Sequence, residues 1–243
     1  MAEFQNRQFI VTGGGGAIGR ACAVDLLGRG ARVLLVDINR QRLDTVMDEL
    51  GGTDRLTAHG SDLGSPAAAA EAFEVAGGKV HGLINMAGLF EHDLLDPDDH
   101  STWDRSMAAN LTNAYDLAVA FQKYRDPDGI GQIVLCSSLA FRRGARGHVA
   151  YSTAKAGIVG MTRSLSREFA PHTRVNAVAP GLIHTTMTEE VVATRGDAHL
   201  ATVPLARLGT PEDVSGVVTF LCSDAAAYVT GQVINVDGGV WNT

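Results

Sequence analysis

Short runs of apolar residues recur along the whole chain, and glycine-rich or polar turns separate them. Most of these runs are continuously apolar and rich in β-branched residues, a pattern typical of parallel strands that are buried on both faces of a sheet. The sequence therefore predicts strands over residues 9–12, 32–37, 56–60, 82–85, 132–137, 174–179 and 232–236.

Longer segments between these strands place apolar residues at helical spacing, and they predict helices over residues 18–28, 102–123, 151–170 and 210–221. The last of them opens with Thr-Pro-Glu-Asp, which supplies an N-cap, a proline at the first helical position and acidic residues in the first turn. Because strands and helices alternate without a repeat or linker, we expect one α/β domain over residues 1–243. Its core is a doubly wound, seven-stranded parallel sheet flanked by helices.

Residues 183–207 form the longest stretch without a clear strand or helix pattern. The stretch follows a predicted strand end, which is where open α/β sheets bind their ligands. Long irregular segments at such edges are often functional, so we expect a mobile lid, with an ordinary surface excursion as the alternative.

Composition narrows the class of protein. The chain has 243 residues, of which 45% are hydrophobic, enough for one well-buried core. Its net charge of −7 argues against a nucleic acid or an anionic membrane as the partner. The three cysteines form no CxxC pair, and neither a signal-peptide pattern nor an apolar run near the ~18 residues of a membrane span occurs in the sequence. We therefore expect a cytoplasmic protein with reduced thiols.

The first predicted strand runs into Thr-Gly-Gly-Gly-Gly-Ala-Ile-Gly, residues 12–19, and then into a helix. Such a turn lets backbone N–H groups approach a pyrophosphate at the helix N-terminus. Asp37 closes the second strand, where a carboxylate accepts hydrogen bonds from the adenosine ribose and repels a 2′-phosphate. Neither the turn nor Ile38 and Asn39 supplies a cation, so we predict NAD rather than NADP. The alternative is that Asp37 only caps a turn.

A second group of residues indicates proton chemistry. Tyr151 and Lys155 lie four residues apart near a predicted helix start and share one face. A phenol titrates near ~10, and a neighbouring ammonium lowers that pKa toward the physiological range. Ser138 follows the fifth strand, and that strand end and the next helix start both face the ligand crevice of a doubly wound sheet.

Taken together, these motifs resemble the short-chain dehydrogenase/reductase family over essentially the whole chain, and the resemblance implies a Rossmann fold. One departure is Ala17, which stands at the family's middle glycine, and we expect only a small adjustment there. The further matching segments are Asp62-Leu63, Asn85-Met86-Ala87-Gly88, Asn110 in Ala-Asn-Leu, Pro180-Gly181-Leu182-Ile183-His184-Thr185, and the closing Val-Asp-Gly-Gly that ends at Gly239.

The resemblance implies an oxidoreductase that acts on CH–OH groups, with the catalytic tetrad Asn110, Ser138, Tyr151 and Lys155. Ser138 would stabilise charge on the substrate oxygen, and Tyr151 would exchange the proton as hydride moves to or from the nicotinamide. Lys155 would bind the nicotinamide ribose, and Asn110 would hold a helix backbone and a water. The implied substrate contacts are Ser138, His148 and Tyr151. The implied NAD contacts are Gly13, Gly16, Ile18, Gly19, Asp37, Ile38, Asp62, Leu63, Asn85, Ala87, Gly88, Tyr151, Lys155, Pro180, Gly181, Ile183 and Thr185.

By general pattern the chain looks like 3-oxoacyl carrier-protein reductases and NAD-dependent sugar or secondary-alcohol dehydrogenases. Asp37, with the acidic Asp126 and Asp128 beside Arg125, favours a small alcohol, polyol or hydroxyacyl substrate. A 3-oxoacyl-[acyl-carrier-protein] reductase is the alternative. A non-catalytic dinucleotide-binding sensor would require a broken tetrad, and the tetrad is complete.

Three further hypotheses concern clusters outside the tetrad. The basic residues Arg142, Arg143 and Arg146 either form solvated surface or attract an anionic substrate. The acids and histidines of residues 92–100 suit caps and turns better than a metal site, so no metal is expected. His148 raises a serine-hydrolase alternative, but the chain lacks a Gly-x-Ser-x-Gly elbow.

By resemblance, the helices of residues 102–123 and 151–170 imply a homotetramer. Small residues in the second of them would permit close helix contact, among them Ala154, Ala156, Gly157 and Gly160.

Overall fold

The computed structural model describes residues 3–242, apart from the side chain of Arg195. Within that range one parallel sheet has seven strands in the order β3-β2-β1-β4-β5-β6-β7. The strands are β1 (Gln8–Thr12), β2 (Arg32–Asp37), β3 (Leu56–Gly60), β4 (Gly82–Asn85), β5 (Gly131–Cys136), β6 (Thr173–Pro180) and β7 (Val233–Val236). The strand order reverses between β1 and β4, which is the switch point where such sheets bind ligands.

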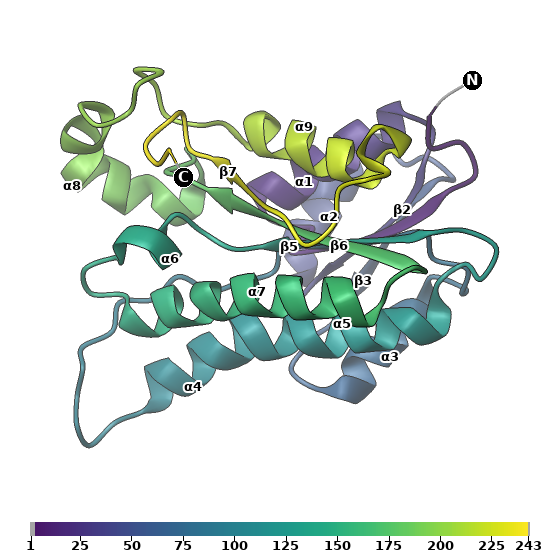
Figure 1. Ribbon diagram of the computed structural model, residues 1–243, viewed down its shortest axis with the longest axis horizontal. Helices are drawn as coiled ribbons and strands as arrows, with labels where there is room; N and C mark the ends of the chain where they lie inside the picture. Colours follow the sequence, from purple (N-terminus) through teal and green to yellow (C-terminus); the bar gives the residue numbers. More distant parts are fainter. Residues whose placement is uncertain (1–2, 243) are drawn as a thin grey trace.

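Helices cover both faces of the sheet (Figure 1). The longer helices are α1 (Ala17–Gly28), α2 (Arg40–Glu49), α3 (Pro66–Val75), α5 (Asn113–Tyr124), α7 (Val149–Glu168), α8 (Glu189–Leu200) and α9 (Pro211–Cys222). The shorter ones are α4 (Ser101–Met107), the π-helical turn η1 (Ala108–Thr112), α6 (Ala140–Arg143) and the 3₁₀ turns η2 (Thr186–Thr188) and η3 (Asp224–Ala226). In Figure 1, α1, α2 and α9 lie on one face, and α3, α4, α5 and α7 lie on the other.

The two faces of the sheet explain the continuously apolar strands. Successive side chains of a strand point to opposite faces. In β2, Val33 and Leu35 therefore belong to the core beneath α1 and α9, whereas Leu34 and Val36 belong to the core beneath α3, α5 and α7. Both cores are closed by helices, so apolar residues are favoured on both faces of β2.

The fold prediction is confirmed, and each predicted strand agrees with the structure to within one residue at either end. The predicted helices at residues 18–28, 151–170 and 210–221 are also present as α1, α7 and α9. The expected helix at 102–123 is interrupted by η1, so it consists of α4, η1 and α5.

Sequence patterns missed three of the longer helices, α2, α3 and α8. The helix α2 is strongly polar and buries only Leu43 and Val46, whereas α3 is rich in alanine. The stretch 183–207, expected to be irregular, contains η2 and α8. A helix with only two buried apolar residues, or one composed largely of alanine, shows little hydrophobic periodicity in its sequence. These helices were therefore not predicted. Among the described residues, no helix combines the length and apolarity that a membrane span requires.

Candidate active site

The turn between β1 and α1 requires glycine because the backbone passes close to other segments. Gly13 has φ +66°, and a Cβ there would lie 2.8 Å from the Ala87 backbone nitrogen. The Gly16 N–H donates to the Gly13 carbonyl at 3.0 Å, and a Cβ on Gly19 would overlap that same carbonyl. Ala17 is the first residue of α1, where a methyl group is accommodated. Between Gly13 and Gly19 the turn is closed by backbone contacts, and this cradle without side chains fits a dinucleotide pyrophosphate.

Asp37 connects the end of β2 to this turn. Its Oδ2 accepts a hydrogen bond from the Gly15 N–H at 3.0 Å, and its Oδ1 accepts one from the Asn39 N–H at 2.9 Å. Asp37 thus caps the turn as well as placing a carboxylate at its rim. The stem of Arg42 lies there too, because a Cβ on Gly15 would be 2.7 Å from the Arg42 Cβ. Arg42 lies five residues beyond Asp37, outside the two positions considered from the sequence, and its approach to the turn was not predicted.

The other predicted cofactor contacts follow the carboxyl ends of neighbouring strands. The Thr12 hydroxyl donates to Asn85 Oδ1 at 2.5 Å and accepts from the Ala87 N–H at 3.3 Å, which ties β1 to β4. Leu63 and Ile183 are buried, whereas Ile38 and Asp62 are exposed. The carboxyl ends of parallel strands lie at one edge of the sheet. The predicted cofactor-binding segments therefore lie side by side along that edge. The segments follow β1, β2, β3, β4 and β6.

Lys155 and Asn110 meet at Gly88, just after β4. A Cβ on Gly88 would lie 2.6 Å from Asn110 Oδ1 and 3.2 Å from Lys155 Nζ. Lys155 is buried, and its ammonium donates a hydrogen bond to the Cys136 carbonyl at 2.9 Å. The same Nζ is 5.6 Å from the centre of the Tyr151 ring. The fold thus brings three members of the predicted tetrad together from α7 and η1.

Asn110 is fixed by backbone groups of two segments. Its Oδ1 accepts from the Leu89 N–H at 3.1 Å, and its Nδ2 donates to the carbonyls of Leu89 at 2.9 Å and Ser106 at 3.0 Å. Because the Asn110 side chain itself occupies the Ser106 carbonyl, the surrounding helix widens into the π-turn η1, a form often found at functional sites. Asn110 therefore positions the loop that follows β4.

Ser138 and Tyr151 form the side of the site that would face a substrate. The Ser138 hydroxyl is hydrogen-bonded to the Tyr151 phenol and also accepts from the Ala140 N–H at 3.2 Å. Burial raises the pKa of Tyr151 well above its ordinary value, and the hydrogen bond with Ser138 offsets this only in part. Burial likewise lowers the pKa of Lys155.

Contrary to the expectation, the pKa of Tyr151 is raised rather than lowered, although Lys155 lies nearby. The ammonium bonds to the Cys136 carbonyl rather than to the phenol, and removal of the phenol from water dominates its titration. Burial therefore favours the protonated form of the Tyr151 phenol.

A cavity of about 260 Å³ opens in front of Ser138 and Tyr151. His148 lines it, as the resemblance implied, and stacks on Phe90 with ring centres 3.9 Å apart, while Phe90 meets Tyr151 edge-on at 4.9 Å. The His148 Nδ1 bonds to the Glu91 backbone carbonyl at 2.7 Å rather than to a carboxylate, which is not the arrangement of a hydrolase triad. Phe90 lies in the loop after β4 and carried no signal in the sequence.

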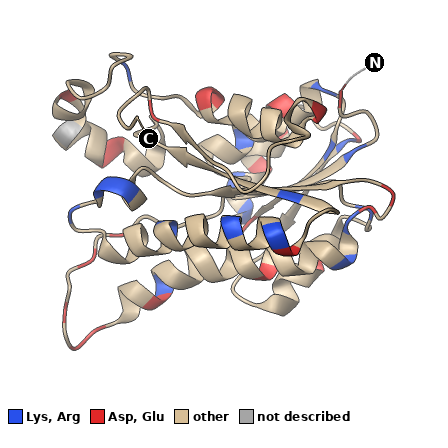
Figure 2. Cartoon of the chain, viewed as in Figure 1, with Lys and Arg blue, Asp and Glu red and all other residues tan. Residues whose placement is uncertain are grey.

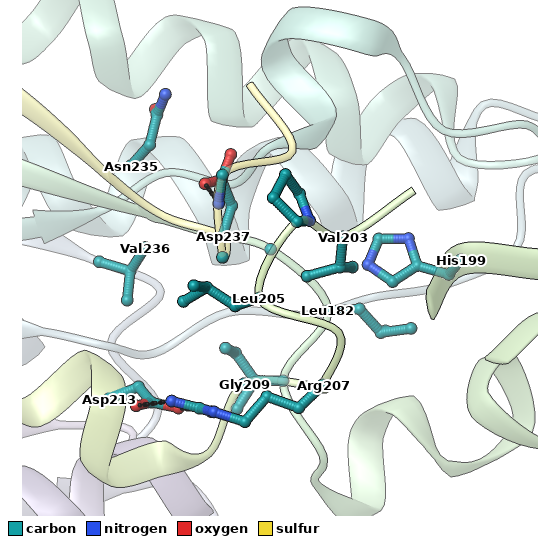
Figure 3. A pocket seen from close by; sticks show the side chains of 15 residues that line it. Leu182, His199, Val203, Leu205, Arg207, Gly209, Asp213, Asn235, Val236 and Asp237 are labelled. Carbon is teal, nitrogen blue, oxygen red and sulfur yellow. Dashed lines mark hydrogen bonds and ion pairs between the residues drawn. The ribbon is translucent and has the colours of Figure 1, made fainter. Parts of the chain in front are cut away.

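A second hollow of about 430 Å³ lies between the segment after α8 and the end of β7 (Figure 3). Its wall includes Leu182, Val203, Leu205 and Asp237, and the ion pair between Arg207 and Asp213 lies at one side. Gly181, Leu182 and His199 line both hollows, so the two are adjacent. No group of His, Cys, Asp and Glu suited to a metal ion occurs within residues 3–242.

Comparison with known proteins gives a consistent result over nearly the full length. The family model described as "Enoyl-(Acyl carrier protein) reductase" matches residues 15–241. The 3-oxoacyl-[acyl-carrier-protein] reductases of Aquifex aeolicus and Thermotoga maritima are 36% and 34% identical, with 98% of this chain and 99% of each relative covered. A Brucella melitensis structure titled "Short-chain dehydrogenase/reductase SDR:Glucose/ribitol dehydrogenase" superposes with a TM-score of 0.94 at 38% identity, covering 99% of both chains.

Proposed function

The chain belongs to the short-chain dehydrogenase/reductase family of oxidoreductases, and we propose that it interconverts a secondary alcohol and a ketone with NAD(H). The observation that carries the proposal is the convergence of Ser138, Tyr151 and Lys155 at one end of a cavity, with the glycine turn at the same sheet edge. A buried phenol hydrogen-bonded to a serine is suited to exchanging a proton with a substrate oxygen.

NAD(H) would be held by the turn from Gly13 to Gly19, by Asp37 at the end of β2, and by Lys155. When bound, its nicotinamide ring supplies or accepts the hydride. Asp37 supports NAD(H) over NADP(H), because its carboxylate borders the turn through the Gly15 N–H and would repel a 2′-phosphate.

In the direction of reduction, each protein group has a defined task. The Ser138 hydroxyl donates a hydrogen bond to the ketone oxygen and stabilises the negative charge that develops there. The Tyr151 phenol, whose protonated form is favoured by burial, gives its proton to that oxygen. The Lys155 ammonium, held by the Cys136 carbonyl, stabilises the resulting phenolate. Asn110 holds the loop at Gly88 and Leu89 so that the phenol and the ammonium keep their places.

A 3-oxoacyl thioester is a second candidate for the substrate, and the relatives support it. The Aquifex and Thermotoga proteins carry the name 3-oxoacyl-[acyl-carrier-protein] reductase and match along the whole chain. The chemistry at Tyr151 would be the same, since a 3-oxoacyl group also presents a ketone. The two candidates differ in cofactor and in what lies beyond the ketone.

The decisive experiment is a panel of alcohols, polyols, ketones and 3-oxoacyl thioesters, assayed with NAD(H) and with NADP(H) at several pH values. We expect turnover with a kcat/KM at least about 10-fold higher for NAD(H). A preference for NADP(H) would refute the role of Asp37 and favour the carrier-protein reductase. NAD binding with no turnover across the panel would instead indicate a dinucleotide sensor.

We further propose a homotetramer that functions in the cytoplasm. Exposed apolar side chains on the outer side of α4 and α5 support self-association, namely Trp103, Tyr115 and Val119. Cys22, Cys136 and Cys222 are free thiols, as expected of a reducing compartment. Light scattering at micromolar concentration tests the assembly, and a monomer there would contradict it.

A further inference from the structure

We propose that Arg143 and Arg146 form an anion-binding subsite at the mouth of the substrate cavity, and that the substrate is a small oxo or hydroxy acid whose carboxylate binds there. The inference rests on the proposed function, because it assigns the substrate class of the same site. It depends on the charge of the cavity wall, on the partners of the two arginines, and on their distance along the chain from Ser138.

The wall of the cavity carries only one sign of charge. Besides Ser138 and Tyr151, its polar lining includes the arginines 143 and 146 and the histidines 148 and 199. No aspartate or glutamate is among the lining residues that the structure describes, although the chain has 27 acidic residues and a net charge of −7. The acids of α8 at positions 189, 190 and 197 are exposed and lie outside the lining. Figure 2 shows α6 as a short basic helix beside α8.

The two arginines are not neutralised by carboxylates in the described part of the chain. Arg143 Nη2 lies 3.4 Å from His199 Nδ1, and burial together with Arg143 lowers the pKa of that histidine. A neutral His199 accepts a hydrogen bond and leaves the guanidinium charge uncompensated. Arg146 is exposed and has no ion pair within residues 3–242. By contrast, Arg207 and Arg105 each pair with an acid, at Asp213 and Glu91.

The backbone brings both arginines close to the reacting position. The helix α6 begins two residues after Ser138 and ends at Arg143. Gly144 and Gly147 then have φ +71° and +78°, which turns the loop back toward α7 and Tyr151. A side chain at Gly147 would collide with His92, at 2.6 Å from its Nε2, so this return path is fixed. Both ends of the arginine loop are therefore attached to residues that hold the substrate oxygen.

The size of the cavity favours a small free acid over a carrier-linked thioester as the substrate. Ligand pockets commonly span ~300–1,000 Å³, so a cavity of about 260 Å³ suits a small molecule. The acyl group of a thioester is uncharged, and the phosphate of its pantetheine arm lies many bonds from the ketone. An arginine that lines the same small cavity as Ser138 thus matches a carboxylate a few carbons from the ketone.

The test compares acids with their uncharged esters. Reduction of 3-oxobutyrate and 4-oxopentanoate is measured beside their methyl esters and 3-oxobutyryl-coenzyme A, in the wild type and in Arg143→Gln, Arg146→Gln and the double variant. We expect the wild type to prefer at least one acid over its ester and over the thioester. The double variant should lower kcat/KM for that acid roughly 10- to 100-fold, mainly through KM, and change the ester by less than about threefold.

Arg32→Gln is the matched control, because it removes the same charge. Arg32 is exposed at the amino end of β2, at the opposite end of the strand from the cavity edge. A wild type that prefers esters or the thioester, or a double variant that affects acid and ester equally, would overturn the subsite. Turnover of none of these compounds would count against the proposed function instead. The subsite is then judged by calorimetric binding of 3-hydroxybutyrate with NADH, a pair that cannot react, where equal binding by wild type and double variant would overturn it.

Discussion

Two helices border the substrate cavity, and they are packed very differently. The helix α7 carries Tyr151 and Lys155, and it buries eight of its residues against β6, α4 and the π-turn. The helix α8 contributes Val191 and His199 to the cavity wall, but among its described residues only Gly196, which has no side chain, is buried. The proposed acid–base groups are thus held by a dense core, whereas the groups proposed to contact the rest of the substrate are held by few contacts.

The difference follows from the residues at each interface. Small residues of α7 allow close approach, and a Cβ at Gly157 would lie 2.8 Å from the Leu111 side chain. The helix α8 instead follows η2, whose Thr185 and Thr188 cap each other, and it stands clear of the sheet (Figure 1). Local stability therefore falls from α7 to α8, which allows binding residues to adjust while the tyrosine stays in place.

The largest expected effect comes from removing the proton donor on α7. Tyr151→Phe keeps the ring that packs on Phe90 but deletes the hydroxyl, so kcat should fall roughly 10²- to 10⁴-fold while NADH binding is retained. Steady-state kinetics and NADH fluorescence measure the two quantities. Tyr115→Phe, at an exposed position of α5, is the control. A variant with near-normal kcat would refute Tyr151 as the acid–base group.

A pair of truncations tests the packing contrast directly. Ile158 on α7 is 1% exposed, so Ile158→Ala should lower the free energy of unfolding by about 2–5 kcal/mol. Val191 on α8 is only partly buried, and Val191→Ala should cost less than about 1 kcal/mol while changing KM severalfold. Urea denaturation and substrate titration separate these outcomes. Similar losses of stability in both variants would remove the basis of the comparison.

A methyl group at the meeting point of Asn110 and Lys155 should affect stability and catalysis together. The Cβ of Gly88→Ala would displace Asn110 Oδ1 and crowd Lys155 Nζ, so we expect a loss of about 1–3 kcal/mol in unfolding free energy. The kcat should drop in the same variant. Gly216→Ala in α9 meets nothing within 4 Å and should be neutral or stabilising. Unchanged kcat in Gly88→Ala would show that the lysine tolerates displacement.

The smallest expected effect is on stability, and it comes from the pH-dependent ion pair between Arg207 and Asp213 in the segment after α8. The Arg207 guanidinium and the Thr210 N–H lower the pKa of Asp213 from 3.8 to about 2. Because the folded-state pKa is the lower one, this contribution to stability is complete above about pH 4 and is lost as the pH falls toward 2. Both side chains are partly exposed, so solvent screens the pair. Asp213→Asn should lower the melting temperature at pH 7 by less than about 3 °C, and the difference from wild type should vanish near pH 2. A difference that persists there would assign the effect to helix capping.

Sequence patterns were sufficient for the sheet because burial on both faces leaves an unambiguous apolar run, as in β2 and β5. They were insufficient for α8, which has no buried apolar stripe to produce a period. The tetrad followed from motif spacing and family resemblance. Other features depend on contacts between distant segments, which no local sequence pattern predicts. They are the pKa of Tyr151, the approach of Arg42 to the glycine turn, and the position of His199 in the lining of both hollows.

The hydrogen bond from Lys155 to the Cys136 carbonyl has a consequence for molecular recognition. An ammonium group has three N–H donors, and within the described chain the backbone of β5 takes one of them, at 2.9 Å. Two donors are left, which is the number that a vicinal diol can accept. In the proposed complex with NAD(H), Lys155 would join one fixed point of the sheet to two adjacent oxygens of the ribose. A ribose that lacked either oxygen would leave a buried donor without a partner.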